Sequence, residues 1–396
     1  MKSVKKLAAI LISVSMLFVF TSCNGNDEES GNTADTNNAA NGAVSGTADY
    51  AQDMRGLSAK ELVAEMKTGW NLGNTLDANE GETSWGNPET THEMIDEVAK
   101  AGFDVIRIPT TWEQHFLEGE DYKIDPEWMA RVTEVVNYGI DNGMYVILNC
   151  HHETNWIKPA TSELDSFTPK FTAMWKQIAE NFAEYGDHLL FEGLNEPRII
   201  GGENEWNGGT EDGRKALNTL NKLFVETVRA TGGNNGTRAL LVPSFAAAVT
   251  DAALGDFEVP DDPNMIVSLH AYTPFDFTFS DGKNIFNYDD SVGNSIDWLF
   301  GVIDKYFTSK DIPVIITEYG SVNKIEDFAQ VPNPRYAENV KWVTKYLERA
   351  KESGIPCVWW DNGSHFGTGE LFGIFNREEL TWYTPDLIDA IMKVYE

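Results

Sequence analysis

The feature that most constrains the fold is a regular alternation of short apolar runs with amphipathic segments. The apolar runs lie at residues 68–74, 103–109, 144–153, 188–197, 239–244, 265–272, 313–320 and 356–363. Runs without polar alternation are typical of parallel strands that are buried on both faces. Eight such strands separated by helices predict a protein of the α/β class with a single (β/α)8 barrel, the TIM barrel.

The segments between the runs are predicted to form the outer helices of this barrel. Apolar residues recur at helical spacing in the stretches 91–102, 126–143, 171–186 and 384–396. Gly102, Gly143 and Gly186 end the first three stretches. Because glycine is favoured directly after the last residue of a helix, we expect each of them to end its helix.

The position of the polar residues distinguishes the barrel from its main alternative, a doubly wound open sheet. Eight polar or aromatic residues stand at or just after the C-terminal ends of the runs, namely Arg107, His151, Asn195, Glu196, His270, Tyr272, Glu318 and Trp360. In a barrel, all of these ends meet at one rim. An open sheet instead concentrates its ligand groups at one switch point. No G-x-G-x-x-G or Walker loop follows the first run, so the barrel is preferred.

The N-terminal segment has the composition of an export signal. Residues 1–22 combine a basic start with an apolar stretch, and the cysteine that follows predicts a lipoprotein-type signal peptide with lipid on Cys23. Phe20 stands where such signals more often have Leu, so an ordinary cleaved signal with an incidental cysteine is the alternative. We expect an extracellular protein in both cases. It is either anchored to the bacterial cell surface through Cys23 alone or secreted.

A polar segment separates this signal from the barrel. Between residues 24 and 49 the only large apolar residue is Val44, so the segment 23–51 cannot bury a core and is predicted to be a disordered linker. The expected arrangement is therefore a signal, a tether and one barrel domain at 52–396. We expect this domain to be a monomer.

Charge and composition narrow the class of partner. The net charge of −32 argues against nucleic acid, because phosphate binding requires clusters of Lys and Arg. The chain has twelve tryptophans, and those not buried can stack on flat sugar faces. The only acid close to the pair His151 and His152 is Glu153, and Cys150 and Cys357 lie in or beside apolar runs. We therefore expect no metal site and no disulfide framework.

Two glutamates suggest a specific reaction. Glu196 ends the fourth run in the sequence FEGLNEPR, and Glu318 ends the seventh, 122 residues later (318 − 196 = 122). Strands four and seven of a barrel lie across the rim from each other, so both carboxylates can face one bond. Acetal hydrolysis uses such a pair. A separation of roughly 5 Å gives retention of configuration, whereas a wider gap gives inversion.

The other rim residues can support these two acids. Arg107 can keep Glu318 ionised, or it can be a structural salt-bridge partner. Tyr272 can donate to the nucleophile with His270 nearby, and Asn195 can bind a sugar 2-hydroxyl. The remaining groups are suited to holding the sugar: His151 and His152 can bind hydroxyls, and Trp360 can form the floor of the subsite next to the bond.

The ordered set of motifs resembles glycoside hydrolase family 5. The motifs GWNLGNTLDA, GFDVIRIPTTW, VILNCHHE, LNEPR, HAYTPFDF, ITEYG and WWDNG occur in the order typical of the family, and the resemblance covers residues 52 to 396. They are most similar to the bacterial endoglucanase branch that also contains xyloglucanases and lichenases. The resemblance implies a retaining enzyme without a cofactor.

The resemblance also implies roles for individual residues. Glu196 matches the acid/base and Glu318 the nucleophile. The shared active-site positions are matched by Arg107, His151, Asn195, His270, Tyr272 and Trp360. Residues similar to those that grip glucose units on the non-reducing side are His152, Asn74 and Asp77. Trp206 is a candidate for a stacking ring on the product side, and a loop-anchoring role fits it equally well.

Three functional hypotheses follow. The first is a retaining endo-β-1,4-glucanase that acts on cellulose-like chains and mixed-linkage glucan. The second retains this chemistry on xyloglucan or, less readily, mannan, in a cleft open enough for side branches. The third is a surface glycan-binding lipoprotein without catalysis. The presence of both Glu196 and Glu318 disfavours it.

Overall fold

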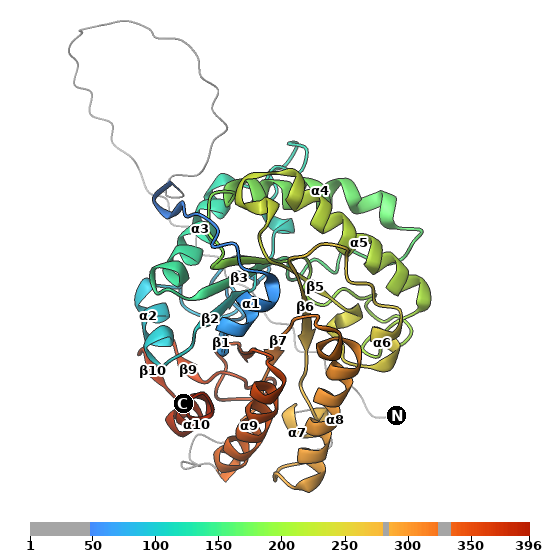
Figure 1. The fold of residues 1–396 in the computed structure, drawn as a ribbon. Helices are drawn as coiled ribbons and strands as arrows, with labels where there is room; N and C mark the ends of the chain where they lie inside the picture. The colour runs from blue at the N-terminus through green and yellow to red at the C-terminus, as the bar shows by residue number, and fades with distance from the viewer. Residues whose placement is uncertain (1–47, 280–284, 324–333) are drawn as a thin grey trace, which may run out of the picture. The chain divides into compact units, whose positions relative to one another are not determined.

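The computed structural model describes residues 48–279, 285–323 and 334–396 (Figure 1). The predicted signal peptide, Cys23 and the linker as far as residue 47 lie outside the described residues. The end of the expected linker is structured, because Ala48–Tyr50 form a 3-10 helix, η1, and the Tyr50 ring stacks on Tyr185 with 6.0 Å between centroids. The folded domain therefore includes residues 48–51 in addition to the predicted range.

Eight parallel strands form a closed barrel. They are β1 (Thr68–Leu72), β2 (Val105–Ile108), β3 (Tyr145–Asn149), β4 (Leu189–Glu192), β5 (Leu240–Pro243), β6 (Met265–His270), β7 (Val314–Tyr319) and β8 (Cys357–Asp361). Each pairs with its neighbour in chain order, and β1 also pairs with β8, which closes the ring. Every strand lies within one of the predicted apolar runs. The (β/α)8 barrel is confirmed, and the open sheet is excluded.

Helices surround the barrel, as Figure 1 shows. They are α1 (Ala59–Glu65), α2 (His92–Lys100), α3 (Pro126–Asp141), α4 (Leu164–Asn181), α5 (Glu211–Ala230), α6 (Asp251–Gly255), α7 (Phe275–Thr278), α8 (Asp290–Tyr306), α9 (Pro334–Ser353) and α10 (Pro385–Val394). A small antiparallel sheet of β9 (Phe375–Asn376) and β10 (Thr381–Trp382) follows β8. The four helices predicted from apolar spacing correspond to α2, α3, α4 and α10.

Local sequence signals explain most of the helix ends. Thr91 Oγ1 accepts a hydrogen bond from the Met94 N–H at the start of α2, and Gly102 follows this helix with φ of 111°. Gly143 follows α3 in the same way, with φ of 68°. The prediction for Gly186 is wrong, because α4 already ends at Asn181. Phe182 and Tyr185 lie between Asn181 and Gly186, and both side chains are buried. Burial of these two rings is compatible with the earlier end of the helix.

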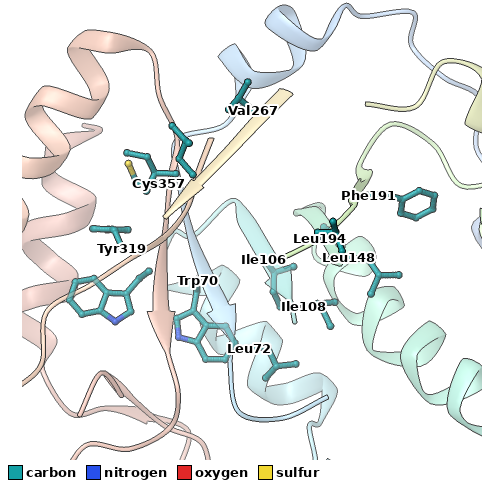
Figure 2. Packing of buried hydrophobic residues seen from close by; sticks show 14 of the residues in the cluster. Trp70, Leu72, Ile106, Ile108, Leu148, Phe191, Leu194, Val267, Tyr319 and Cys357 are labelled. Atoms are coloured by element: carbon teal, nitrogen blue, oxygen red, sulfur yellow. The ribbon is translucent and has the colours of Figure 1, made fainter. Parts of the chain in front are cut away.

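Alternate residues of each strand face two different apolar layers. Trp70, Ile106 and Leu148 belong to the large core between the strands and the helices, part of which Figure 2 shows. Their neighbours Val105 and Ile147 belong to a second cluster inside the barrel. Residues of α1 pack against this inner cluster. The inner apolar layer fills the barrel on the side where the strands begin and leaves the other rim to polar side chains.

Candidate active site

The C-terminal ends of the strands surround a cavity of about 1190 Å³. All but one of the eight predicted rim residues line it, namely His151, Asn195, Glu196, His270, Tyr272, Glu318 and Trp360. The exception is Arg107, which is fully buried directly beneath the cavity floor. The fold therefore gathers at one place residues that are spread over more than 250 positions of the sequence (360 − 107 = 253).

Arg107 connects several strand ends. Its Nη1 donates to Glu318 Oε1 at 2.7 Å, its Nη2 donates to Asn195 Oδ1 at 2.7 Å, and its Nε donates to Glu192 Oε2 at 2.7 Å. Asn71 Oδ1 accepts a further bond from Nη1 at 3.0 Å. Because charge-assisted hydrogen bonds are strong and the guanidinium is planar, this network fixes Glu318 and Asn195 relative to each other.

A layer of buried polar residues below the rim was not predicted from the sequence. Glu192 accepts hydrogen bonds from Asn149 Nδ2 at 3.0 Å and from the Ser268 hydroxyl, in addition to the bond from Arg107. Asn71 Nδ2 donates to the Thr317 carbonyl at 2.9 Å. Each of these residues is a polar residue within a mostly apolar strand. Such a polar residue was the only sign in the sequence that a buried hydrogen-bond network was present.

Glu318 lies within strand β7 and is held on several sides. Besides Arg107, the Tyr272 hydroxyl donates to its Oε2 at 2.9 Å, and His270 Nδ1 lies 3.3 Å from the same oxygen. Burial raises the pKa of the Glu318 carboxyl, and the negative charge of Glu196 adds to this. The charges of His270 and Arg107 and the Tyr272 hydrogen bond act in the opposite direction and favour the carboxylate.

Glu196 lies four residues beyond the last residue of β4 and has different partners (196 − 192 = 4). His270 Nδ1 lies 2.8 Å from its Oε1, and Arg198 Nη1 donates to its Oε2 at 3.3 Å. Burial opposes ionisation of Glu196, but the His270 hydrogen bond and the charges of His270, Arg198 and His152 outweigh it and lower the pKa.

The two carboxylates are close to each other. A carboxylate oxygen of Glu196, one of Glu318 and a ring nitrogen of His270 all lie within 4.8 Å of one another. Carboxyl groups roughly 5 Å apart are typical of retaining glycosidases, whereas inverting enzymes leave a wider gap for water. Of the two outcomes left open by the sequence, the geometry favours retention.

His151 and Trp360 form one wall of the cavity. Their rings are stacked with 3° between the planes and 5.8 Å between centroids. His151 Nδ1 lies 3.0 Å from Asn149 Nδ2, and burial lowers the pKa of this histidine well below its usual value. The neutral ring can therefore act as a hydrogen-bond partner for a sugar hydroxyl beside the flat face of Trp360.

A second group of predicted residues lies beside this wall. Asp77 Oδ1 accepts a bond from the Thr75 N–H at 2.7 Å, and its buried Oδ2 lies 3.5 Å from His152 Nε2. The exposed indole of Trp85 lies 5.4 Å from the His152 ring. Asn74, with φ of 55°, lies in the same loop but does not line the cavity. Trp85 was not predicted as a site residue, because the polar segment of sequence around it contains no recognisable motif.

Among the residues that the structure describes, two groups of side chains have the composition of a metal site. One is Asp77, His151 and His152, and the other is Glu196, His270 and Glu318, with one potential ligand atom per residue within 4.8 Å of the others. In the second group, a cation would bind oxygen atoms of the two carboxylates that lie closest together at the rim. The expectation of metal-free catalysis remains a prediction.

Aromatic side chains extend the cavity away from the carboxylates. Trp206 is half exposed, and the Arg198 guanidinium lies over its ring at 4.0 Å from the centroid. Trp206, Phe275 and Trp298 all line the cavity. The indole of Trp206 therefore packs against Arg198 of its own loop and also lines the cavity, so the two roles considered for it are compatible. Phe275 and Trp298 were not predicted.

Within the described residues, we find no helix with the length and apolar character required to cross a membrane. This finding concerns residues 48–279, 285–323 and 334–396 and does not extend to the predicted signal peptide.

Comparison with known proteins places these features in a family. Residues 70–366 match the family model for cellulase (glycosyl hydrolase family 5). Endoglucanase A of Ruminococcus albus is 51% identical over 349 residues, which are 86% of this chain and 94% of the relative. Endoglucanase B of Neocallimastix patriciarum is 44% identical over 354 residues, which are 86% and 72% of the two chains.

Solved structures agree with the sequence comparison. A broad-specificity GH5-4 endoglucanase from Ruminococcus champanellensis with bound cellotriose has a TM-score of 0.81 at 43% identity and covers 86% of this chain and 100% of its own. A xyloglucan-specific endo-β-1,4-glucanase of family 5 from a metagenomic library, also with cellotriose, has a TM-score of 0.79 at 42% identity and covers 84% and 97%.

Proposed function

The chain belongs to the cellulase family, glycosyl hydrolase family 5, and we propose that Glu318 and Glu196 divide the two acid–base tasks of its reaction. The protein is a glycoside hydrolase, an endo-β-1,4-glucanase that acts with retention of configuration. The observation that carries the proposal is the pair of carboxylates within 4.8 Å of each other at the ends of β4 and β7. This spacing is suited to double displacement.

Glu318 is the proposed nucleophile. Its carboxylate attacks the anomeric carbon and forms a covalent glycosyl-enzyme, while the bond to the leaving oxygen breaks. The attack requires the ionised form, which Arg107 and the Tyr272 hydroxyl favour through direct hydrogen bonds. The same bonds hold the attacking oxygen in place, because neither donor can move without breaking other buried contacts.

Glu196 is the proposed acid/base. It protonates the leaving oxygen in the first step and removes a proton from water in the second. Two buried carboxylates this close hold one proton as a unit, and His270 contacts both. In the unliganded protein, the surroundings lower the pKa of Glu196 and raise that of Glu318. These directions favour the shared proton on Glu318, whereas the reaction requires it on Glu196. In our proposal, binding of the sugar beside Glu196 moves the proton to that carboxyl, with His270 in contact with both groups, before the leaving oxygen takes it up.

The remaining predicted residues hold the substrate in our proposal. Asn195, fixed by Arg107 at 2.7 Å, binds the 2-hydroxyl of the sugar that is attacked, a contact that strengthens in the transition state. Trp360 forms the floor of that subsite, with His151 beside it. Hydroxyls of the preceding glucose units on the non-reducing side are bound by His152, which lines the cavity. The fully buried Asp77 orients that ring from 3.5 Å, and Asn74 lies in the adjoining loop.

The substrate is a β-glucan, and we propose cellulose-like and mixed-linkage chains as the preferred polymers. The cavity of about 1190 Å³ exceeds the size that suits a single small ligand and can accommodate several sugar units. Xyloglucan is the alternative. It is supported by the broad specificity and xyloglucan specificity in the names of two similar structures. No cofactor is required by this mechanism.

Rates on four polymers test the proposed preference. Carboxymethylcellulose, barley β-glucan, xyloglucan and mannan are compared at equal mass, with Glu318→Gln as the blank. We expect the highest kcat/KM on the first two. A rate on xyloglucan equal to that on barley β-glucan would assign broad specificity instead. Absence of activity on all four, with a normal melting temperature, would favour the glycan-binding lipoprotein.

We also propose that the protein is extracellular and monomeric. The lipoprotein-type signal predicts anchoring to the cell surface through Cys23, with residues 24–47 as part of a polar tether, and secretion is the alternative. Incorporation of labelled palmitate into the wild type, but not into Cys23→Ala, tests the anchor. Release of unlabelled wild type into the medium would indicate a secreted protein.

A further inference from the structure

We propose that Trp298, with Asn294 and Ser295 beside it on helix α8, forms a distal subsite that binds a sugar unit of the leaving group, remote from the cleaved bond. This inference rests on the proposed function, because it takes the occupant to be the β-glucan chain already bound at the two carboxylates. The additional subsite would make the rate of cleavage depend on the length of the substrate chain.

The exposure of Trp298 is unusual for its position in the fold. Helix α8 buries Ile296, Leu299 and Phe300 against the barrel, while the Trp298 side chain is 56% exposed on the other face. With more than half of its surface exposed, this large indole gains only part of the stabilisation that burial would provide. A single exposed aromatic is common on protein surfaces, so exposure by itself does not identify a site.

The surroundings of Trp298 provide the second observation. Trp298, Asn294 and Ser295 line the same cavity as Glu196 and Glu318. Asn294 and Ser295 precede the tryptophan by four and three positions, so the three side chains share one face of the helix. The exposed indole is therefore directed at the cavity that contains the catalytic groups and not at the outer surface.

This part of the cavity lies on the leaving-group side. Beyond Glu196, its walls are formed by Arg198 and Trp206 and by the stretches 246–250 and 273–275. Of the three residues assigned to the opposite side, His152 lines the cavity and Asn74 and Asp77 do not. Because Glu196 protonates the leaving oxygen, the sugar units that lie beyond it belong to the leaving group.

Contacts between helices support this placement. Lys305 Nζ near the end of α8 lies 2.6 Å from Asp251 Oδ1 at the start of α6. Helix α6 directly follows the stretch 246–250, which forms part of the leaving-group wall. In Figure 1, α6, α7 and α8 follow β5 and β6 on one side of the barrel. Helix α8 therefore forms the far wall of this half of the cavity.

The chemistry of the three residues suits a sugar. One face of a glucose ring is made of C–H groups, which stack on a flat aromatic surface, while its hydroxyls require hydrogen-bond partners. The Asn294 amide offers two donors and an acceptor, and among the described residues none forms a hydrogen bond with it. Ser295 Oγ donates to the Ser291 carbonyl at 2.9 Å and retains its acceptor capacity. The group is uncharged, which is compatible with a neutral polysaccharide.

The cleavage pattern of a defined oligosaccharide tests the proposal. Cellohexaose labelled at its reducing end is digested by the wild type, by Trp298→Ala and by Trp298→Phe. Loss of the platform should shift cleavage towards bonds that place fewer sugars on the leaving-group side. The ratio of kcat/KM on cellohexaose to kcat/KM on an aryl cellobioside should fall roughly threefold to tenfold in Trp298→Ala. Trp298→Phe keeps a ring and should lose less.

Gly301→Ala is the matched control on the same helix. Residue 301 is exposed, does not line the cavity, and a Cβ atom built there meets no heavy atom within 4 Å. This variant should keep the wild-type pattern and rates. An unchanged pattern in Trp298→Ala, or an equal loss on both substrates, would overturn the distal subsite. A wild-type protein that cleaves neither substrate would instead contradict the proposed function, whatever the variants do.

Discussion

Glu318 is part of strand β7, whereas Glu196 stands on the loop that follows β4. The Glu318 side chain is 6% exposed and contacts the fully buried Arg107, which also binds Glu192 below the rim. The Glu196 side chain is 18% exposed, and its cationic partner, Arg198, lies at the cavity wall under the half-exposed Trp206.

This difference corresponds to the two tasks that we propose for these carboxylates. A nucleophile must be positioned within a fraction of an ångström of one carbon atom, so a strand and a buried arginine suit it. An acid/base must exchange a proton with a sugar oxygen and later with water, so it requires access to the cavity. The barrel holds one carboxylate as part of its core and the other as part of its substrate channel. Four substitutions test this distinction.

Glu318→Gln should have the largest effect. The amide cannot attack the anomeric carbon, and we expect turnover of cellohexaose to fall by roughly 10⁴-fold or more. The amide oxygen can still accept a bond from Arg107, so the melting temperature should change little. Single-turnover kinetics and thermal unfolding measure the two quantities. Near-normal turnover would mean that the nucleophile is elsewhere.

Arg107→Gln should damage the fold as well as the reaction. It leaves Glu318 and Glu192 buried without their cation, which we expect to reduce the free energy of unfolding by about 3–5 kcal/mol. Since Arg107 lowers the pKa of Glu318, the variant binds a proton there more readily. Its loss of stability should therefore be largest at high pH and should decrease as the pH falls. Urea unfolding at several pH values measures this, and a pH-independent loss would contradict it.

Glu196→Gln should affect the reaction in a way that depends on the leaving group. Removing the general acid should reduce kcat/KM on cellohexaose by roughly 10²–10⁴-fold. A dinitrophenyl cellobioside requires little protonation, so its first step should be much less affected, and the glycosyl-enzyme should accumulate because the second step lacks its base. A burst of dinitrophenol followed by slow turnover is the expected signal. Equal losses on both substrates would assign Glu196 a different role.

Arg198→Gln should have the smallest effect on rate, up to about fivefold, because its pair with Glu196 is partly exposed. The charge of Arg198 lowers the pKa of Glu196, so its removal should raise that pKa. The protonated acid would then persist to higher pH, and the alkaline limb of kcat/KM should move upwards. Stability should remain close to that of the wild type, in contrast to Arg107→Gln.

Arg229→Gln serves as the control for this variant. Arg229 has the same exposed fraction as Arg198, 16%, and pairs with Asp262 away from the cavity. The control should leave both limbs of the pH profile unchanged. An alkaline limb that moves downwards in Arg198→Gln, or moves equally in the control, would remove Arg198 from the surroundings of the acid.

The sequence predicted the residues at the rim of the site better than the buried polar residues below it. Glu196 and Glu318 could be found because each follows an apolar run within a recognisable motif, and the expected contacts of Glu318 with Arg107 and Tyr272 are present. Glu192 could not be found, although it belongs to the FEGLNEPR motif, because its position at the end of β4 gives no sign of its three buried hydrogen-bond partners. Such partners come from other strands, and one sequence carries no record of their proximity.

The ends of helices and the residues that line the cavity were also only partly predictable from the sequence, because both depend on tertiary contacts. The end of α4 was misplaced because burial of Phe182 and Tyr185 overrode the local preference of Gly186. The sequence around Trp298 does not indicate a binding role, since a tryptophan on an amphipathic helix is normally predicted to be part of the core. Only the orientation of α8 shows that this residue is directed at the cavity.

By itself, the sequence determined the number and order of the strands, the rim at which polar groups collect and the two acids, because strand burial and short motifs are local properties of the chain. The tertiary structure decided which carboxylate is rigid, how far apart the two lie, and which aromatic residues face the substrate. These properties depend on side chains that meet only when the barrel closes, since β1 and β8 are almost 300 residues apart (361 − 68 = 293).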